Sequence, residues 1–166
     1  ANNSKNIVIN LDCPNASKIS HKSFKTFSTK NPNADFYAYD IKATPTGVEY
    51  TFMDTKFKLQ MLGAFNVSNA LATISACSFL GINPLECAKT LEGFLGIKTR
   101  LEKIGSKKDI TIYNDFAHNP SKIRASLEAL KAYNGRIIAM YQPHTPFSAV
   151  NTGSEMAQEI AKVLDE

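Results

Sequence analysis

The residues best suited to chemistry are Asp115, His118 and Asn119, which lie close together in the sequence. An apolar, β-branched run precedes them at Ile110–Tyr113 and predicts a buried strand. Pro120 follows an N-capping residue and predicts the start of a helix. The three side chains would therefore stand between a strand and a helix N-terminus, where α/β proteins bind ligands and phosphate oxygens. The alternative is that Asp115 and Asn119 only cap the helix and that His118 is a solvated loop residue.

A second apolar run, Arg136–Tyr141, follows the predicted helix. We predict a second buried strand there, so that Ile110–Tyr141 forms a parallel, right-handed strand–helix–strand crossover. Gln142 and His144 come directly after this strand, and we expect them beside the turn that carries the candidate chemistry. The spacing of Thr152–Glu155 is that of a capping box and predicts a last helix.

The first half of the chain has a different pattern. Lys5–Asp12 is a compact apolar run that predicts a strand, and aromatic residues around Phe24–Phe27 predict another. From Asp35 to Met61 apolar and polar residues alternate between short turns, which predicts an antiparallel meander with one wet face. A helix is expected from Gly63 to Leu80, and a second one is expected to begin at Pro84.

Asn66 and Asn69 lie three positions apart in the first turn of the predicted helix, so both face the same side. Each amide supplies donors and an acceptor, the combination that reads the edge of a purine. An ordinary cap beside a solvated amide is the alternative reading of the same spacing.

Composition limits the class of protein. The chain has 166 residues, 43% of them hydrophobic and 20% charged, which fits a globular protein. Its net charge of +4 comes from scattered lysines, so a nucleic-acid partner is not expected. The three cysteines lack metal-ligand spacing and are expected as reduced thiols. No apolar run is long enough to span a membrane, and we expect a cytoplasmic protein.

The division of the chain follows from a hydrophilic stretch at Leu101–Lys107. We predict one domain over residues 1–106 and another over residues 107–166, both of the α/β class. Two parallel strands are too few for a finished doubly wound sheet, so we expect the second domain to be incomplete.

Four short motifs in this order resemble those of the Mur ligase family, the ATP-dependent amide-forming ligases of peptidoglycan precursor synthesis and recycling. Within that family the resemblance is to the branches that add L-alanine to UDP-N-acetylmuramate or recycle murein tripeptide. The motifs are Gly63-x-x-Asn66-x-x-Asn69-Ala70, Gly96-Ile97-Lys98-x-Arg100, Asn114-Asp115-Phe116-Ala117-His118-Asn119-Pro120 and Gln142-Pro143-His144.

The resemblance implies the rear part of a central ATP-binding domain, with its meander and helices, followed by the first part of a Rossmann-like C-terminal domain. It implies an enzyme of cell-wall biogenesis that joins an amino acid or peptide to UDP-N-acetylmuramate through an acyl phosphate, with ATP and Mg²⁺ as cofactors of the intact ligase.

By motif match the resemblance also assigns roles to individual residues. Asn66 and Asn69 would lie near the adenine, Arg100 near the phosphates and Asp115 near the ribose hydroxyls. His118 and Asn119 would be catalytic and face the phosphoryl group or the amine. Gln142 and His144 would bind substrate.

The chain also departs from the family pattern. The Gly-rich phosphate loop ending in Gly-Lys-Thr or Gly-Lys-Ser does not occur in it, and neither do the upstream acidic and His residues that hold Mg²⁺, so we assign no metal ligand and expect this chain alone to be inactive. It would act with the remainder of the same ligase. The alanine-adding branch usually has His at the positions of Phe65 and Asn119 and Arg at that of Thr145. The amino acid added therefore stays open.

Two alternatives remain from the sequence. A folylpolyglutamate synthetase-like ligase shares the architecture and would differ in the domain that binds the acceptor. A non-catalytic binding module of the same fold would differ in having no phosphate loop in the full gene.

Overall fold

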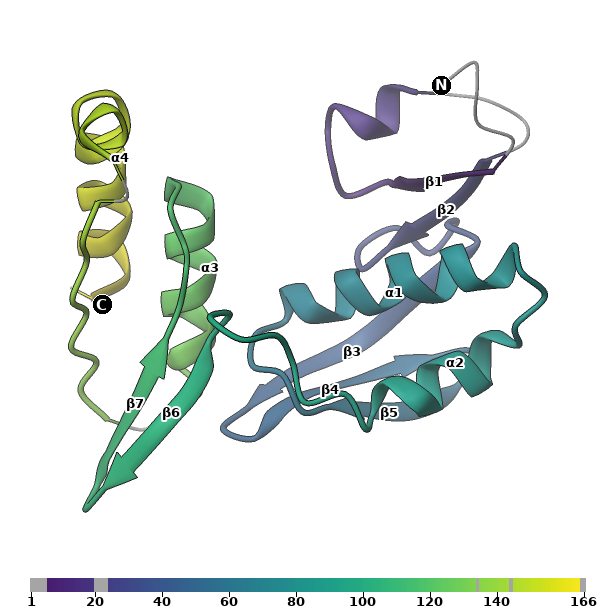
Figure 1. The fold of residues 1–166 in the computed structure, drawn as a ribbon. Helices are drawn as coiled ribbons and strands as arrows, with labels where there is room; N and C mark the ends of the chain where they lie inside the picture. The colour runs from purple at the N-terminus through teal and green to yellow at the C-terminus, as the bar shows by residue number, and fades with distance from the viewer. Residues whose placement is uncertain (1–5, 20–23, 134, 144, 165–166) are drawn as a thin grey trace. The chain divides into compact units, whose positions relative to one another are not determined.

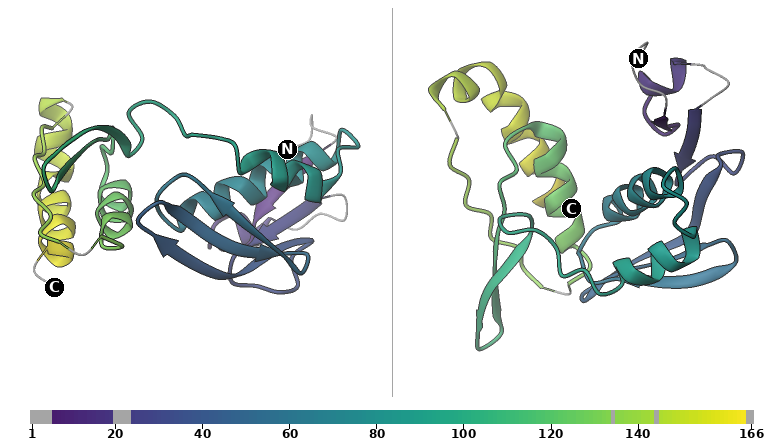
Figure 2. Two further views of the ribbon diagram at one scale, coloured as in Figure 1. Left: turned by 90° about the horizontal axis from the view of Figure 1, so that it is seen from below. Right: turned by 45° about the vertical axis from the view of Figure 1, so that its right-hand side comes forward.

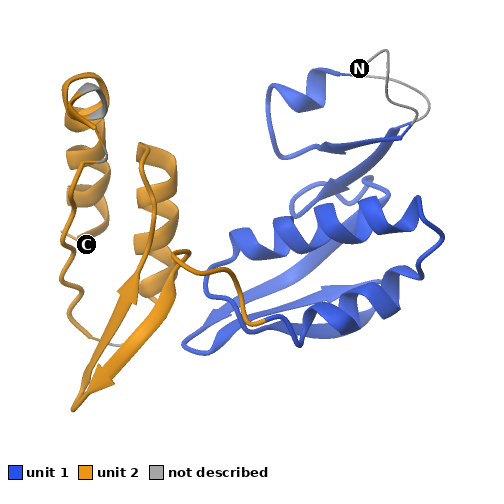
Figure 3. Cartoon of the chain, viewed as in Figure 1, with its two compact units in different colours: residues 1–94 blue, residues 95–166 orange. Residues whose placement is uncertain are grey.

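The computed structural model describes residues 6–19, 24–133, 135–143 and 145–164. The chain forms two compact units, residues 1–94 and residues 95–166 (Figure 3). Each unit has its own apolar core.

Unit 1 contains a five-stranded mixed sheet in sequence order (Figure 1). The first three strands run parallel and the last three antiparallel, so the predicted meander is confirmed. A short 3-10 helix, η1, covers Ala16–Lys18 between the first two strands. The strands are β1 (Ile7–Asn10), β2 (Phe24–Ser28), β3 (Phe36–Thr44), β4 (Gly47–Phe52) and β5 (Thr55–Leu59).

Two helices, α1 (Phe65–Ser78) and α2 (Pro84–Leu91), lie side by side along one face of this sheet (Figures 1 and 2). Asn83 caps α2, because its side-chain oxygen accepts hydrogen bonds from the amides of the second and third residues of the helix. The apolar side chains of α1, of α2 and of the meander form the core of the unit. Those with no exposed surface are Ala38, Val48, Leu59, Val67, Leu71, Ile74 and Ala88.

Polar side chains form a hydrogen-bonded cluster at the C-terminal ends of β1 and β2. The Asp12 carboxylate accepts hydrogen bonds from the hydroxyls of Ser28 and Thr29 and from the Thr29 amide. Ser28 is fully buried, and its oxygen also accepts from the amides of Lys30 and Asn31, at 2.9 and 2.7 Å. Burial alone would raise the pKa of Asp12, but these bonds to its charged form outweigh burial and hold the pKa below its ordinary value.

The lowered pKa of Asp12 predicts acid destabilisation of unit 1. A carboxyl whose pKa is lower in the folded state stabilises the protein above its unfolded pKa, about 3.9, and loses that contribution as the pH falls through the folded value. We expect Asp12→Asn to lower the free energy of unfolding at pH 7 by on the order of 1 kcal/mol, after allowance for solvent screening, and to flatten its decline below about pH 4. Urea titrations from pH 7 to pH 2.5 (a range chosen to bracket the pKa, about 3.9) measure both effects. Asp40→Asn, the same change at an exposed carboxyl, is the control; equal pH profiles for the two variants would contradict the prediction.

Unit 2 begins with a hairpin of β6 (Glu102–Lys107) and β7 (Ile110–Asn114), which pair antiparallel. The helices α3 (Pro120–Leu130) and α4 (Pro146–Leu164) follow and lie side by side (Figures 1 and 2). The helix predicted near residue 152 therefore begins earlier, at Pro146. The core between the two helices consists of Ile123, Leu127, Met156 and Val163.

The predicted crossover over Ile110–Tyr141 is wrong for this structure. β7 pairs with the hairpin strand before it, and the side chains of Ile110 and Ile112 are 67% and 50% exposed rather than buried. Residues 136–141 form no strand. Ile137 and Tyr141 pack against the helices, whereas Ile138 and Met140 are 78% and 99% exposed, so the run is not buried as a whole.

The boundary between the units also differs from the predicted one. The compact units divide after Phe94 rather than after residue 106, because Glu102–Lys107 pairs with β7 and so belongs to unit 2. In the described part of the chain, no helix has the length and apolarity that crossing a membrane requires.

Candidate nucleotide-binding site

The turn between β7 and α3 carries most of the candidate residues, and Asn119 closes it. The Asn119 side-chain oxygen accepts from the Lys122 amide at 3.0 Å and from the Ser121 hydroxyl at 2.9 Å, so it caps α3 as predicted. Pro120 is the first residue of the helix. The N-terminus of α3, the positive end of its helix dipole, therefore faces the turn.

The backbone carbonyl of Phe116, two residues earlier, holds the His118 ring at this turn. Its Nδ1 lies 2.9 Å from the Phe116 carbonyl oxygen, and its Nε2 lies 3.5 Å from Lys122 Nζ. Because a carbonyl can only accept, the first contact places the ring proton on Nδ1 and leaves the lone pair of a neutral ring on Nε2. An imidazole fixed in this way can accept a proton at Nε2.

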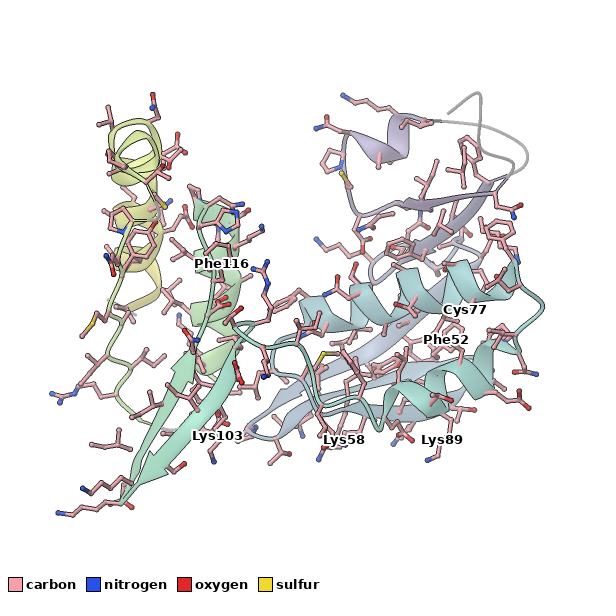
Figure 4. All side chains as sticks on the ribbon, in the orientation of Figure 1. Phe52, Lys58, Cys77, Lys89, Lys103 and Phe116 are labelled. Carbon is pink, nitrogen blue, oxygen red and sulfur yellow. The ribbon has the colours of Figure 1, made fainter. Side chains whose placement is uncertain are left out.

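Arg100 meets the same turn from the segment before β6. Its Nη1 lies 3.3 Å from the Phe116 carbonyl oxygen, and its guanidinium carbon lies 5.7 Å from the centre of the Phe116 ring. The ring of His118 also packs on the Phe116 ring, and the centres of the two rings are 5.0 Å apart. Unit 2 therefore brings Arg100 and His118 together around Phe116, which Figure 4 shows on the turn.

Asp115 has both carboxylate oxygens engaged. One accepts from the Leu101 amide at 3.4 Å, and the other accepts from the Ser126 hydroxyl on α3. A carboxylate accepts about four hydrogen bonds, so ligand hydroxyls can be added to these two. The sequence analysis gave no role to Ser126, and none to Phe116 although it stands inside a motif, because the contacts of Arg100 with Phe116 and of Ser126 with Asp115 join residues that are separated along the chain.

In unit 1, Asn66 and Asn69 are in contact at the start of α1. Asn69 Nδ2 donates to Asn66 Oδ1 at 3.0 Å, and Asn66 Nδ2 donates to the Leu62 carbonyl oxygen at 2.8 Å. Asn66 is buried and Asn69 is exposed. The inner amide thus orients the outer one, and Asn69 is the better placed of the two to meet a ligand. Their position near adenine stays a prediction.

The predicted substrate residues are less defined. Gln142 is exposed and follows the irregular run at residues 136–141, and His144 lies outside the described residues. Their position beside the turn stays a prediction. Among the residues that the structure describes, no three His, Cys, Asp or Glu side chains are grouped so that they could hold a metal ion.

Comparisons with known proteins agree with this architecture. The family model of the Mur ligase middle domain matches residues 1–77, and that of the Mur ligase glutamate ligase domain matches residues 99–165. The UDP-N-acetylmuramate–L-alanine ligase of Dictyoglomus turgidum is 33% identical over 164 residues, which cover 93% of this chain and 35% of that protein.

Solved structures share the fold. A crystal structure of MurF from Acinetobacter baumannii is 21% identical and superposes with a TM-score of 0.80 over 97% of this chain and 36% of that one. The MurF ligase of Thermotoga maritima, solved in complex with ADP, is 20% identical with a TM-score of 0.62 and covers 79% of this chain and 31% of that one.

The chain therefore spans about a third of the length of the relatives that it matches. The two family models follow one another along it in the order of its two compact units. Together with the Dictyoglomus relative, they show that the chain belongs to the Mur ligase family.

Proposed function

We propose that this chain is part of an ATP-dependent ligase that joins an amino acid or peptide to UDP-N-acetylmuramate in peptidoglycan precursor synthesis or recycling. Unit 1 would supply residues that bind the adenine, and unit 2 would supply residues that bind the ribose and the phosphates. The observation that carries the proposal is the cluster of Arg100, Asp115 and His118 around the Phe116 turn at the start of α3. A cation, a carboxylate and a helix N-terminus together suit the phosphates and ribose of a nucleotide.

The proposed reaction has two steps. A carboxylate oxygen of the substrate attacks the γ-phosphorus of ATP, ADP leaves, and an acyl phosphate forms. The nitrogen of the amine then attacks the carbonyl carbon, phosphate leaves, and the nitrogen gives up a proton. Arg100 would offset negative charge on the transferring phosphoryl group, and His118 Nε2 would accept the proton of the amine.

The remaining residues would bind the nucleotide and the substrate. Asp115 would accept from the ribose hydroxyls, Asn69 would read the adenine edge with Asn66 behind it, and Gln142 with His144 would contact the substrate. Mg²⁺ would neutralise phosphate charge in the intact ligase, and no step is assigned to it through the residues described here. A ligase that uses these substrates would work in the cytoplasm, where ATP is available.

The test is the reaction itself, carried out with the full-length gene product that contains this chain. We expect ADP release that requires ATP, Mg²⁺, UDP-N-acetylmuramate and one amino acid or peptide, with an amide product of matching mass. When the substrate carboxylate carries ¹⁸O, one labelled oxygen should appear in the released phosphate, because the acyl phosphate transfers it. ADP release that needs no acceptor, or phosphate without label, would contradict the proposal.

For this chain alone, we expect weak nucleotide binding. The phosphate loop supplies most phosphate contacts in such ligases and does not occur in the sequence. Calorimetry should give a millimolar dissociation constant for ATP, a binding free energy of about −4 kcal/mol, and no hydrolysis. Inorganic triphosphate in place of ATP serves as the control for the contribution of adenine and ribose. A micromolar constant would overturn the expectation.

A further inference from the structure

Two residues that flank Arg100 have left-handed backbone conformations. Thr99 has a φ of 59° and Leu101 a φ of 45°, and neither is glycine. A β-branched or bulky residue rarely adopts this backbone conformation, so the surrounding contacts must hold the segment in place. The conformation of these two residues sets the direction in which the Arg100 side chain leaves the backbone.

Four hydrogen bonds of its backbone groups hold this segment within unit 2, beside the bond from the Arg100 side chain to the Phe116 carbonyl oxygen. The Phe116 amide donates to the Thr99 carbonyl oxygen at 2.8 Å, and the Thr99 amide donates to the Glu102 carboxylate at 2.8 Å. The Arg100 amide donates to the Ile97 carbonyl oxygen at 3.2 Å, and the Leu101 amide donates to the Asp115 carboxylate at 3.4 Å. Only the last of these bonds connects the segment to a side chain of the site.

Asp115 is in turn fixed by α3. Its second carboxylate oxygen accepts from the hydroxyl of Ser126, in the second turn of the helix. Ser126 is half-buried beside Leu127, a core residue, so its position is set by the packing of α3 against α4. A continuous path therefore leads from the core of unit 2 through Ser126 and Asp115 to the Leu101 amide.

We propose that Ser126 is a positioning residue for Arg100. Through Asp115 it holds the strained segment at residues 99–101, and this keeps the Arg100 guanidinium against the carbonyl and ring of Phe116. The role of Arg100 at nucleotide phosphates rests on the proposed function, but the positioning itself does not require a ligand. Asp115 thus has two tasks, because the carboxylate that would bind ribose also anchors the segment that carries the phosphate-binding cation.

The test uses the ligand-free chain and measures Arg100 and Leu101 directly. Nuclear magnetic resonance follows the Arg100 Nε–H signal and the hydrogen exchange of the Leu101 amide in Ser126→Ala. Loss of a charge-assisted anchor should speed exchange at Leu101 by roughly ten-fold and shift the Arg100 signal. Alanine is the best helix former, so α3 itself should stay folded.

Two further variants separate positioning from general destabilisation. Ser121→Ala removes a hydroxyl from the same helix, but that hydroxyl contacts Asn119 rather than Asp115, so the Arg100 and Leu101 signals should not move. Ser126→Thr keeps the hydroxyl and should restore both signals. Unchanged signals in Ser126→Ala, or equal changes in Ser126→Ala and Ser121→Ala, would overturn the proposal.

These outcomes are distinct from those that test the proposed function. If the full-length protein fails to release ADP while Ser126→Ala still moves the Arg100 signal, the positioning stands and the ligase assignment fails. If the full-length protein is an active ligase and the Arg100 signal does not respond, only the positioning role of Ser126 is lost.

Discussion

Replacing Leu71 with alanine should destabilise unit 1 by about 2–5 kcal/mol. Leu71 lies in the middle of α1 with none of its side chain exposed and belongs to the core cluster between the helix and the sheet. Its removal costs the transfer free energy of the lost methyl and methylene groups, and the cavity left among rigid β-strands adds to this cost. Because a domain is stabilised by only about 5–15 kcal/mol, such a loss brings unit 1 close to unfolding.

The control for this change is Leu80→Ala. Leu80 is 78% exposed just beyond the end of the same helix, so the identical substitution should change the unfolding free energy by less than about 0.5 kcal/mol. Urea titrations followed by far-ultraviolet circular dichroism measure both variants. Equal midpoints for Leu71→Ala and Leu80→Ala would show that α1 does not form the core against the sheet.

The sequence predicted unit 1 well because its signals are local. Apolar and polar residues alternate over residues 35–61, and the turns between the strands are short enough to favour antiparallel pairing. The buried face follows the alternation in β5, whereas a register shift between Tyr39 and Lys42 interrupts it in β3, and β4 is buried at every position except Glu49.

The signals for the first residues of α2 and α3, Pro84 and Pro120, are local as well. The residue before each proline, Asn83 or Asn119, caps the helix with its own side chain.

In unit 2, local sequence patterns do not predict how the strands pair or which of their residues are buried. The run that begins at Ile110 has the composition of a buried strand, but the burial of a strand depends on what lies against its faces, and Ile110 stays 67% exposed. The strand β6 is polar and contains Gly105, so nothing in its sequence distinguished it from a linker. The sequence therefore predicts β7, its partner in the hairpin, as the first strand of a crossover.

The candidate site divides in the same way. Asp115, His118 and Asn119 could be found from the sequence because they occupy one turn, and the motif order added Arg100. The contacts that orient them come from Phe116 and Ser126, and these depend on how the segment at residues 99–101 packs against the turn. Such tertiary contacts carry no periodicity that a single sequence reveals.

In the full-length ligase, His118→Ala should lower kcat by about 10²–10⁴-fold and change KM for ATP little. A residue that accepts the proton of the amine acts in the transition state, and general acid–base catalysis contributes a factor of this size. The alanine variant removes the proton acceptor together with its contacts to the Phe116 carbonyl and ring, so the stability of the variant is measured beside its rates. Steady-state rates at saturating ATP, with melting temperatures of both proteins, measure the effect.

Asp115→Asn is the matched comparison, since it changes a residue of the same turn that would bind the ribose rather than accept a proton. Asparagine keeps the size and one acceptor, yet it loses charge-assisted hydrogen bonds worth about 1.5–3 kcal/mol. Ribose contacts exist before and during phosphoryl transfer, so their loss should raise KM for ATP by roughly 10- to 100-fold and lower kcat less. If His118 were only a loop residue and Asp115 only a turn residue, both variants would melt at lower temperature and keep their kinetics. That result would show that neither residue belongs to the site. A lower kcat in His118→Ala together with a higher KM for ATP in Asp115→Asn would show that one turn carries both a proton acceptor and a nucleotide contact.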